Sequence, residues 1–234
     1  MSSQWIDITA QDGGQYGAYL ALPPAGTGPG LVLFQEIFGV NEHIRAVADQ
    51  YALDGFVVLA PDVFWRDAPR VELGYTGDDF DRAIALMKAA QPEQLAADIK
   101  TTVATLRARP EVDAAGGKVG AIGYCMGGRL AYIAAADPGV EAAVAYYGGG
   151  IHDQLQRSGS ISCPMLFHYA EQDHAIPLDK VEEVRKAFAG KPAELHVYPG
   201  ATHGFNCWMR GSYHPASAAL AHGRSLQFLA KHLF

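Results

Sequence analysis

Apolar residues along the chain fall into short continuous runs that alternate with longer segments of helical spacing. The short runs are rich in Val, Leu and Ala, which is typical of buried parallel strands. Strands that alternate with helices indicate an α/β fold, with a mostly parallel central sheet and helices on both of its faces. The strands are predicted at 15–22, 30–34, 56–60, 118–123, 142–147, 165–169 and 194–198, and the helices at 41–54, 95–106, 126–136, 178–189 and 217–232.

One stretch interrupts this alternation. Residues 62–93 contain no strand-like run, and we expect loops and a short helix there. No repeat, low-complexity tract or charged linker divides the chain, so we predict one domain over residues 1–234 with this stretch as a variable excursion. In the helix predicted at 95–106, Asp98 and Lys100 are expected to face away from the buried side.

Composition and charge narrow the classes of function. The 234 residues are 49% hydrophobic, which is enough for a sizeable core and too much for a disordered chain. The net charge is −7 and Lys and Arg form no stripe, so a nucleic-acid partner is not expected. No apolar run has the length of a membrane span or a secretion signal. The three cysteines are odd in number and widely spaced, so we expect no disulfide framework, and we predict a cytoplasmic protein without a membrane partner.

The residues that follow each strand are the candidates for chemistry, because ligands of such sheets bind beyond the carboxyl ends of the strands. After the strand at 118–123 the chain reads Gly-Tyr-Cys-Met-Gly-Gly at 123–128 and then enters a helix. This is the spacing of a nucleophile elbow, with Cys125 in place of the usual serine. The small flanking residues let the helix and strand approach closely, and the helix N-terminus favours a thiolate. The alternative is that Cys125 is only a small apolar residue in a glycine-rich turn.

The other members of a catalytic triad are expected in loops after later strands. Asp173 and His203 occupy such positions in the expected order. We predict that His203 accepts the thiol proton of Cys125 and that Asp173 orients the imidazole. Glu171 competes for the role of the acid, and His174 for the role of the base. The remaining histidines have other expected places. Solvated helix surfaces are expected for His43, His222 and His232, and positions inside strands for His168 and His196. Loops without an acidic partner are expected for His152 and His214.

The loop after the strand at 30–34 is where this kind of fold places its second oxyanion donor. That loop begins with Gln-Glu-Ile-Phe-Gly, and we predict the backbone N–H groups of Ile37 and Met126 as the donor pair. Glu36 stands out in the same loop, because a carboxylate directly after a buried strand is costly unless it is paired or functional. The alternative for Glu36 is a loop position that faces solvent.

These motifs resemble the dienelactone hydrolase family, the carboxymethylenebutenolidases, over nearly the whole chain. The resemblance implies an α/β-hydrolase fold and a triad of Cys125, His203 and Asp173. It also implies that Glu36 contacts the nucleophilic sulfur and takes part in its activation, in a monomer (or, alternatively, a dimer) without metal or cofactor. The motifs that carry it are Gln35-Glu36-Ile37-Phe38-Gly39-Val40-Asn41, Ala60-Pro61-Asp62, Gly123-Tyr124-Cys125-Met126-Gly127-Gly128, Tyr146-Tyr147-Gly148, Gln172-Asp173 and His203-Gly204-Phe205.

The substrate-binding residues depart from the family pattern. Family members that hydrolyse dienelactone hold its carboxylate with two arginines, and Arg82 lies near the first of these positions. The second position is occupied here by Cys207, with Arg210 following it. A neutral thiol cannot reproduce bidentate capture by arginine. We therefore predict that one arginine still binds the substrate, and that anionic lactones are accepted but not required. Arg82 is favoured, because the excursion is expected to fold over the strand ends, and Arg210 is the alternative. Tyr146 is a further predicted substrate-binding residue.

The predicted function is a cysteine-dependent hydrolase of small lactones or activated esters, acting through an acyl-thioester on Cys125. The alternative enzyme is a broad carboxylesterase with a different acyl preference. The alternative outside enzymes is a non-catalytic thiol switch or a ligand-binding module. A switch needs a resolving cysteine, and neither Cys163 nor Cys207 shows a pairing signal. A binding module needs neither Asp173 nor His203.

Overall fold

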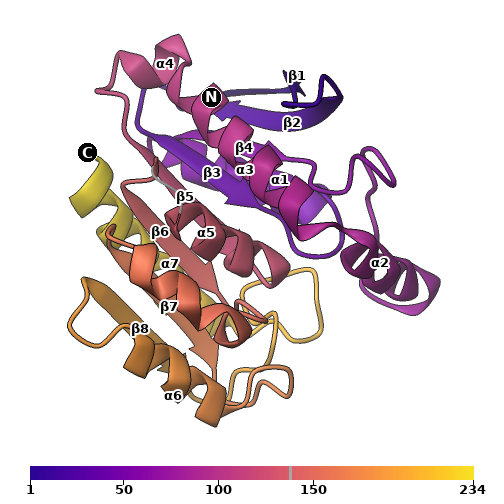
Figure 1. The fold of residues 1–234 in the computed structure, drawn as a ribbon, viewed down its shortest axis with the longest axis vertical. Helices are drawn as coiled ribbons and strands as arrows, with labels where there is room; N and C mark the ends of the chain where they lie inside the picture. Colours follow the sequence, from indigo (N-terminus) through magenta and orange to yellow (C-terminus); the bar gives the residue numbers. More distant parts are fainter. Residues whose placement is uncertain (137–138) are drawn as a thin grey trace. The chain divides into compact units, whose positions relative to one another are not determined.

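The structure is a computed structural model that describes residues 1–136 and 139–234, and the chain divides into two compact units, Met1–Gly120 and Ala121–Phe234. From residue 30 onwards strands alternate with helices, as predicted, apart from three successive helices within 77–113 (Figure 1). The first unit carries β1 (Ser2–Thr9), β2 (Gln15–Leu22), β3 (Gly30–Phe34), α1 (Glu42–Leu53), β4 (Val57–Pro61), α2 (Gly77–Ala89), α3 (Pro92–Arg107) and α4 (Pro110–Asp113). After β5 (Val119–Tyr124), the second unit carries α5 (Met126–Ala136), β6 (Ala142–Tyr146), the 3-10 helix η1 (His152–Ser160), β7 (Met165–Ala170), α6 (Leu178–Ala187), β8 (Ala193–Tyr198) and α7 (Pro215–Leu233).

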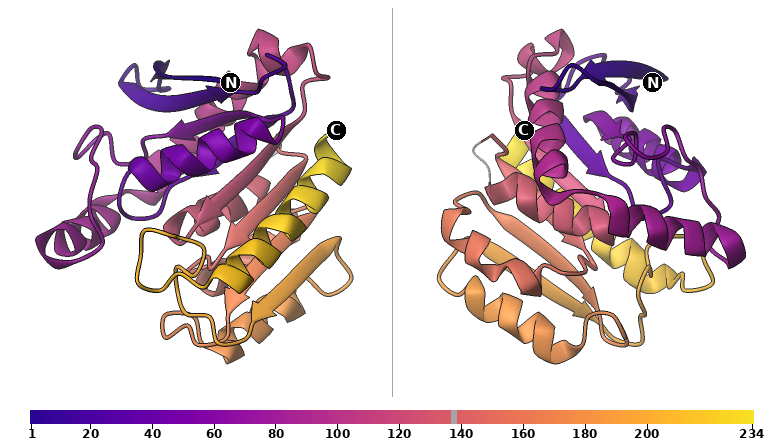
Figure 2. Two further views of the ribbon diagram at one scale, coloured as in Figure 1. Left: turned by 180° about the vertical axis from the view of Figure 1, so that it is seen from behind. Right: turned by 45° about the vertical axis from the view of Figure 1, so that its right-hand side comes forward.

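The strands of the first unit pair in the order β1-β2-β4-β3. β3 and β4 are parallel, with Gly30 opposite Val57, whereas β1 with β2 and β2 with β4 are antiparallel. β3 and β4 are buried along their whole length, as their continuous apolar runs predict. α1 and α3 cover opposite faces of these strands (Figure 2).

Helix α1 begins and ends where its sequence supplies caps. The side chain of Asn41 accepts a hydrogen bond from the N–H of Ile44, and the helix ends before Asp54. The predicted surface position of His43 is wrong, because His43 is fully buried. It lies four residues before the buried Val47, and residues at this spacing share one face of a helix.

The excursion contains loops and α2, and it changes the environment of α3. The predicted outward orientation of Asp98 is wrong, since this residue is only 7% exposed. Its carboxylate accepts hydrogen bonds from Nε1 of Trp65 at 2.9 Å and from Nη2 of Arg66 at 3.0 Å. A carboxylate can be buried when it is paired and hydrogen-bonded in this way. Lys100 is exposed, as predicted.

In the second unit, β6, β7 and β8 form parallel neighbours in that order. The register places Tyr146 opposite His168 and His168 opposite His196. Helices α5 and α6 lie on one face of these strands and α7 lies on the other (Figures 1 and 2). Because the strands are parallel, the loops that follow them leave from one edge, which is where the sequence places its candidate triad.

The prediction of a single domain stays a prediction.

No helix in the described part of the chain is both long and apolar enough to cross a membrane.

Candidate active site

Cys125 lies in a tight turn between β5 and α5, in the backbone conformation of a nucleophile elbow. Its φ angle is +56°, in the left-handed region that residues other than glycine rarely adopt. A Cβ on Gly123 would collide with the carbonyl group of Gly127, and a Cβ on Gly128 would lie 2.7 Å from the carbonyl oxygen of Tyr146. The glycines flanking the cysteine therefore let strand and helix approach as closely as the motif predicts.

The turn is held by backbone hydrogen bonds on both sides of the cysteine. The N–H of Cys125 donates to the carbonyl oxygen of Tyr146 at 3.0 Å, and the carbonyl oxygen of Cys125 accepts from the N–H of Gly128 at 3.0 Å. Met126 is the first residue of α5, where an N–H group has no acceptor within the helix. The side chain of Cys125 thus lies at the positive end of α5, beside an N–H group available to an oxyanion.

Asp173 and His203 lie together, as the sequence predicts for the acid and base of a triad. Nδ1 of His203 lies 2.7 Å from Oδ2 of Asp173. The other carboxylate oxygen, Oδ1, accepts hydrogen bonds from the N–H groups of Ala175 at 2.9 Å and Ile176 at 3.2 Å. The side chain of Asp173 is fully buried, while that of His203 is 23% exposed. The acid is therefore fixed by the backbone, and the base keeps one open side.

The side chain of Cys125 also interacts with His203 and favours its charged form. Burial disfavours the imidazolium, but the neighbouring sulfur of Cys125 and the hydrogen bond to Asp173 outweigh it and raise the pKa of His203 to about 10. The three side chains therefore interact in the order Asp173, His203, Cys125. This arrangement can move the thiol proton to the imidazole and stabilise the resulting positive charge.

The competing acid and base residues lie outside this arrangement. Glu171 is exposed, and its carboxylate accepts a hydrogen bond from the N–H of Gly200 at 2.8 Å. His174 is exposed next to the buried Asp173. Geometry thus favours Asp173 over Glu171 and His203 over His174.

Two aromatic residues at the end of β6 support the site. Tyr147 has a φ of +35°, and its ring meets the ring of His203 edge-on with the centroids 5.1 Å apart. This contact was not predicted from the sequence, although Tyr147 belongs to a motif that carries the family resemblance. Tyr146, predicted to bind the substrate, is fully buried, and its hydroxyl pairs with that of Ser225 at 2.8 Å. The side chain of Tyr146 has no exposed surface, and its role in substrate binding stays a prediction.

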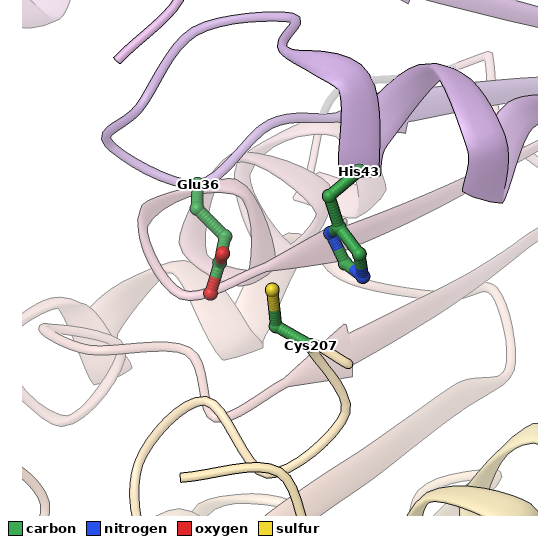
Figure 3. A group of neighbouring side chains, drawn as sticks. All are labelled: Glu36, His43 and Cys207. Carbon is green, nitrogen blue, oxygen red and sulfur yellow. The ribbon is translucent and has the colours of Figure 1, made fainter. Parts of the chain in front are cut away.

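Three of the predicted site residues lie in the first unit: Glu36, Ile37 and Arg82. Glu36 and Ile37 follow β3 and are both buried, with Glu36 only 1% exposed, so the solvent-facing alternative for Glu36 is wrong. A carboxylate oxygen of Glu36 lies within 4.8 Å of a ring nitrogen of the buried His43 (Figure 3). Arg82 lies on α2 and is exposed. The burial of His43 could have been predicted from its helical spacing from the apolar Val47.

Figure 3 also labels Cys207, which belongs to the second unit and is fully buried. The guanidinium of Arg210, in the same loop, packs against Gly204: a Cβ added there would lie 2.6 Å from its Nη1 atom. Gly204 directly follows His203, so this arginine is close to the base in the fold. Within each unit taken by itself, the described residues form no cluster of three metal-ligating side chains. The prediction that no metal or cofactor is needed stays a prediction.

Comparison with known proteins connects this geometry to a family. The sequence model of the dienelactone hydrolase family matches residues 16–233. The chain belongs to the dienelactone hydrolase family. Carboxymethylenebutenolidases from Pseudomonas sp. (strain P51) and Pseudomonas putida are 36% and 34% identical to it, covering 99% and 98% of this chain and 96% and 97% of theirs. A crystal structure of a dienelactone hydrolase candidate from Klebsiella pneumoniae is 32% identical, with a TM-score of 0.88 and 99% coverage of both chains. The dienelactone hydrolase relationship confirms the predicted α/β-hydrolase fold and identifies the chain as a hydrolase of this kind.

Proposed function

We propose that this hydrolase acts on small lactones or activated esters and uses Cys125 as its nucleophile. The observation that supports this most strongly is the series of interactions from Asp173 through His203 to a cysteine in a strained turn. The family relatives named carboxymethylenebutenolidase support a lactone as the substrate class.

In the proposed acylation step, His203 takes the thiol proton and the sulfur of Cys125 attacks the carbonyl carbon. Because Nδ1 of His203 faces the carboxylate of Asp173, Nε2 is the nitrogen that accepts this proton. The tetrahedral intermediate then collapses to an acyl-thioester. Its alkoxide leaving group takes the proton back from His203, and in a lactone the resulting hydroxyl stays attached to the acyl chain.

In the proposed deacylation step, His203 removes a proton from water, and the hydroxide attacks the thioester carbonyl. Collapse of the second tetrahedral intermediate breaks the carbon–sulfur bond, and the sulfur of Cys125 recovers its proton from His203. Each step develops negative charge on the carbonyl oxygen. We assign its stabilisation to the N–H groups of Met126 and Ile37, each such donor being worth roughly a hundredfold or more in turnover.

Charge recognition of the substrate is proposed to depend on arginine. Arg210 is the stronger candidate because its guanidinium packs against Gly204, beside the base. Arg82, favoured by the sequence, is exposed on α2. Glu36 retains its proposed part in activating Cys125, by the resemblance to the family. A buried carboxylate near the nucleophile would disfavour a resting thiolate and so protect the sulfur from oxidation.

Trapping of the covalent intermediate tests the nucleophile. We expect mass spectrometry of a quenched reaction with an aryl ester or lactone to find the acyl group on the peptide that contains Cys125. Cys125→Ala should show no adduct and no turnover, while Cys163→Ala, a matched control at a cysteine outside the triad, should behave as wild type. An adduct on Cys163 or Cys207, or undiminished turnover by Cys125→Ala, would refute the proposal.

A further inference from the structure

A chain of buried polar side chains in the second unit is centred on His168 in β7. His168 is fully buried, with Nδ1 2.8 Å from the hydroxyl oxygen of Tyr198 and Nε2 3.0 Å from that of Ser225. The hydroxyl of Ser225 lies 2.8 Å from that of Tyr146. At the other end, Nη1 of Arg224 donates to the hydroxyl oxygen of Tyr198 at 3.0 Å. The proposed mechanism uses none of these groups.

The direction of the hydrogen bonds follows from the chemistry of the partners. A guanidinium can only donate, so Tyr198 accepts from Arg224 and its own hydrogen is available to Nδ1 of His168. Burial, together with the neighbouring His196 and the positive charge of Arg224, holds the pKa of His168 well below its ordinary value. The ring is therefore neutral, with one accepting and one donating nitrogen. Nδ1 accepts from Tyr198, which leaves Nε2–H to donate to Ser225.

The same chain is connected to the backbone that carries the proposed nucleophile and base. Tyr146 ends β6, and its carbonyl oxygen accepts the hydrogen bond from the N–H of Cys125. The carbonyl oxygen of His168 accepts from the N–H of Tyr147 at 2.7 Å. Tyr147 in turn places its ring against His203. The end of β6 is thus fixed from two sides, through the hydroxyl of Tyr146 and through the backbone of Tyr147.

A second connection runs through β8. Tyr198 is the last residue of β8, and the loop that follows it carries His203. The ring of Phe205, two residues after the base, packs against Tyr198 with the centroids 5.0 Å apart. Since His168 bonds to Tyr198 directly and to β6 through Ser225, one imidazole connects both strand ends.

We propose that His168 is a positioning residue for the triad, held as the neutral Nε2–H tautomer. It fixes the ends of β6 and β8 through Ser225 and Tyr198, and so the distance between Cys125 and His203. It does not touch the substrate. Only the catalytic part of this inference rests on the proposed function; the tautomer does not.

The tautomer is tested on the wild-type protein without any substrate. Long-range ¹H–¹⁵N correlation spectra of the labelled protein should contain one histidine with the Nε2–H pattern that does not titrate between about pH 5 and about pH 9, a range in which ordinary histidines do titrate. Its loss in His168→Gln assigns the signal. An Nδ1–H pattern, or protonation within that range, would overturn the assignment.

The positioning role is tested by kinetics of variants that remove single contacts. Tyr198→Phe and Ser225→Ala each delete one hydroxyl, and His168→Phe keeps the ring but deletes both nitrogens. We expect each to lower kcat about 10- to 100-fold with KM changed no more than about twofold, since misplaced reacting groups slow the chemical step rather than binding. His168→Gln, whose amide can still donate towards Ser225, should recover part of the loss that His168→Phe causes.

His196→Gln is the matched control, because His196 stacks against His168 with centroids 6.0 Å apart but is not in the hydrogen-bonded chain. It should retain the kcat of wild type, and circular dichroism should show all variants folded. If Tyr198→Phe and Ser225→Ala are as active as His196→Gln, His168 has no positioning role. Turnover by Cys125→Ala would instead refute the nucleophile and leave the tautomer result standing.

Discussion

Asp173 holds His203 by a hydrogen bond of 2.7 Å between Oδ2 and Nδ1, and the backbone holds Asp173 in turn. The N–H groups of Ala175 and Ile176 both donate to the other carboxylate oxygen. An ionised carboxylate only accepts hydrogen bonds, so Nδ1 of His203 carries a proton in both the neutral and the charged form of the imidazole. The basic Nε2 atom is thereby presented to Cys125, which is the arrangement that proton transfer from the thiol needs.

The first prediction concerns this orientation. Asp173→Asn should lower kcat by about 10³- to 10⁴-fold, because an amide can donate to Nδ1 and turn the imidazole into the wrong tautomer. The combination of Asp173→Asn with His203→Ala should be little worse than His203→Ala alone, since the residues act as one unit. Steady-state kinetics of the single and double variants with one aryl ester measures both effects.

Two exposed neighbours provide the controls for the triad assignment. Glu171→Gln and His174→Ala change the competing acid and base, and both should retain most of the activity. If His174→Ala proved as damaging as His203→Ala in variants with equal thermal stability, the assignment of the base would be wrong.

The second prediction concerns the strained turn. A non-glycine residue with positive φ costs about 1–2 kcal/mol, and Cys125→Gly removes that cost together with the proposed nucleophile. Glycine also lowers the free energy of unfolding by about 0.5–1 kcal/mol relative to alanine, because it is more flexible in the unfolded chain. We therefore expect Cys125→Gly to be at least as stable as Cys125→Ala in urea denaturation. The control, Ala219→Gly at an exposed position in α7, should lose about 1 kcal/mol. A comparable loss at residue 125 would mean that the turn is not strained.

The elements of the fold are largely predictable from the sequence because their signals are local. The strands β2 and β3 and the helix α5 match the predicted ranges in full. β1 was not predicted, since its mostly exposed residues give no buried apolar run and its pairing with β2 is a tertiary contact. The orientation of Asp98 was not predictable either, because its partner Arg66 comes from the excursion, whose conformation no periodic pattern specifies.

The candidate site, like the fold, was predictable from the sequence only in part. Cys125, Asp173 and His203 were predictable because the elbow motif and the positions after parallel strands are fixed by chain order. The network around His168 was not, because a histidine inside a strand gives no sign of which hydroxyls it will meet. The burial of Tyr146 was not predictable for a related reason, because its contact with Ser225 of α7 is a tertiary contact, and its role in substrate binding stays a prediction.

The third prediction concerns stability against pH. In the folded protein the pKa of His203 is raised from 6.5 to about 10, so the folded state binds the proton more tightly than the unfolded state. This stabilisation is fully present below pH 6.5 and is lost as the pH rises towards 10. The free energy of unfolding of wild type relative to His203→Gln, measured in urea, should therefore fall across that range. Cys125→Ala should weaken the pH dependence, because it removes the side chain that contributes most to raising the pKa of His203. A difference that grows with pH would contradict the prediction.

The last prediction concerns recognition of a charged substrate. An arginine that pairs with a carboxylate in a partly desolvated site contributes about 1.5–3 kcal/mol, or about one to two orders of magnitude in affinity. Arg210, packed against Gly204 beside the base, should supply most of this, and the exposed Arg82 less. For a matched pair of anionic and neutral lactones, Arg210→Ala should lower the charged-to-neutral ratio of kcat/KM more than Arg82→Ala does. Both variants should still hydrolyse the neutral lactone, since charge is accepted but not required. If the ratio falls only in Arg82→Ala, Arg82 is the residue that binds the substrate carboxylate. If the ratio is unchanged in both variants, neither arginine binds the substrate.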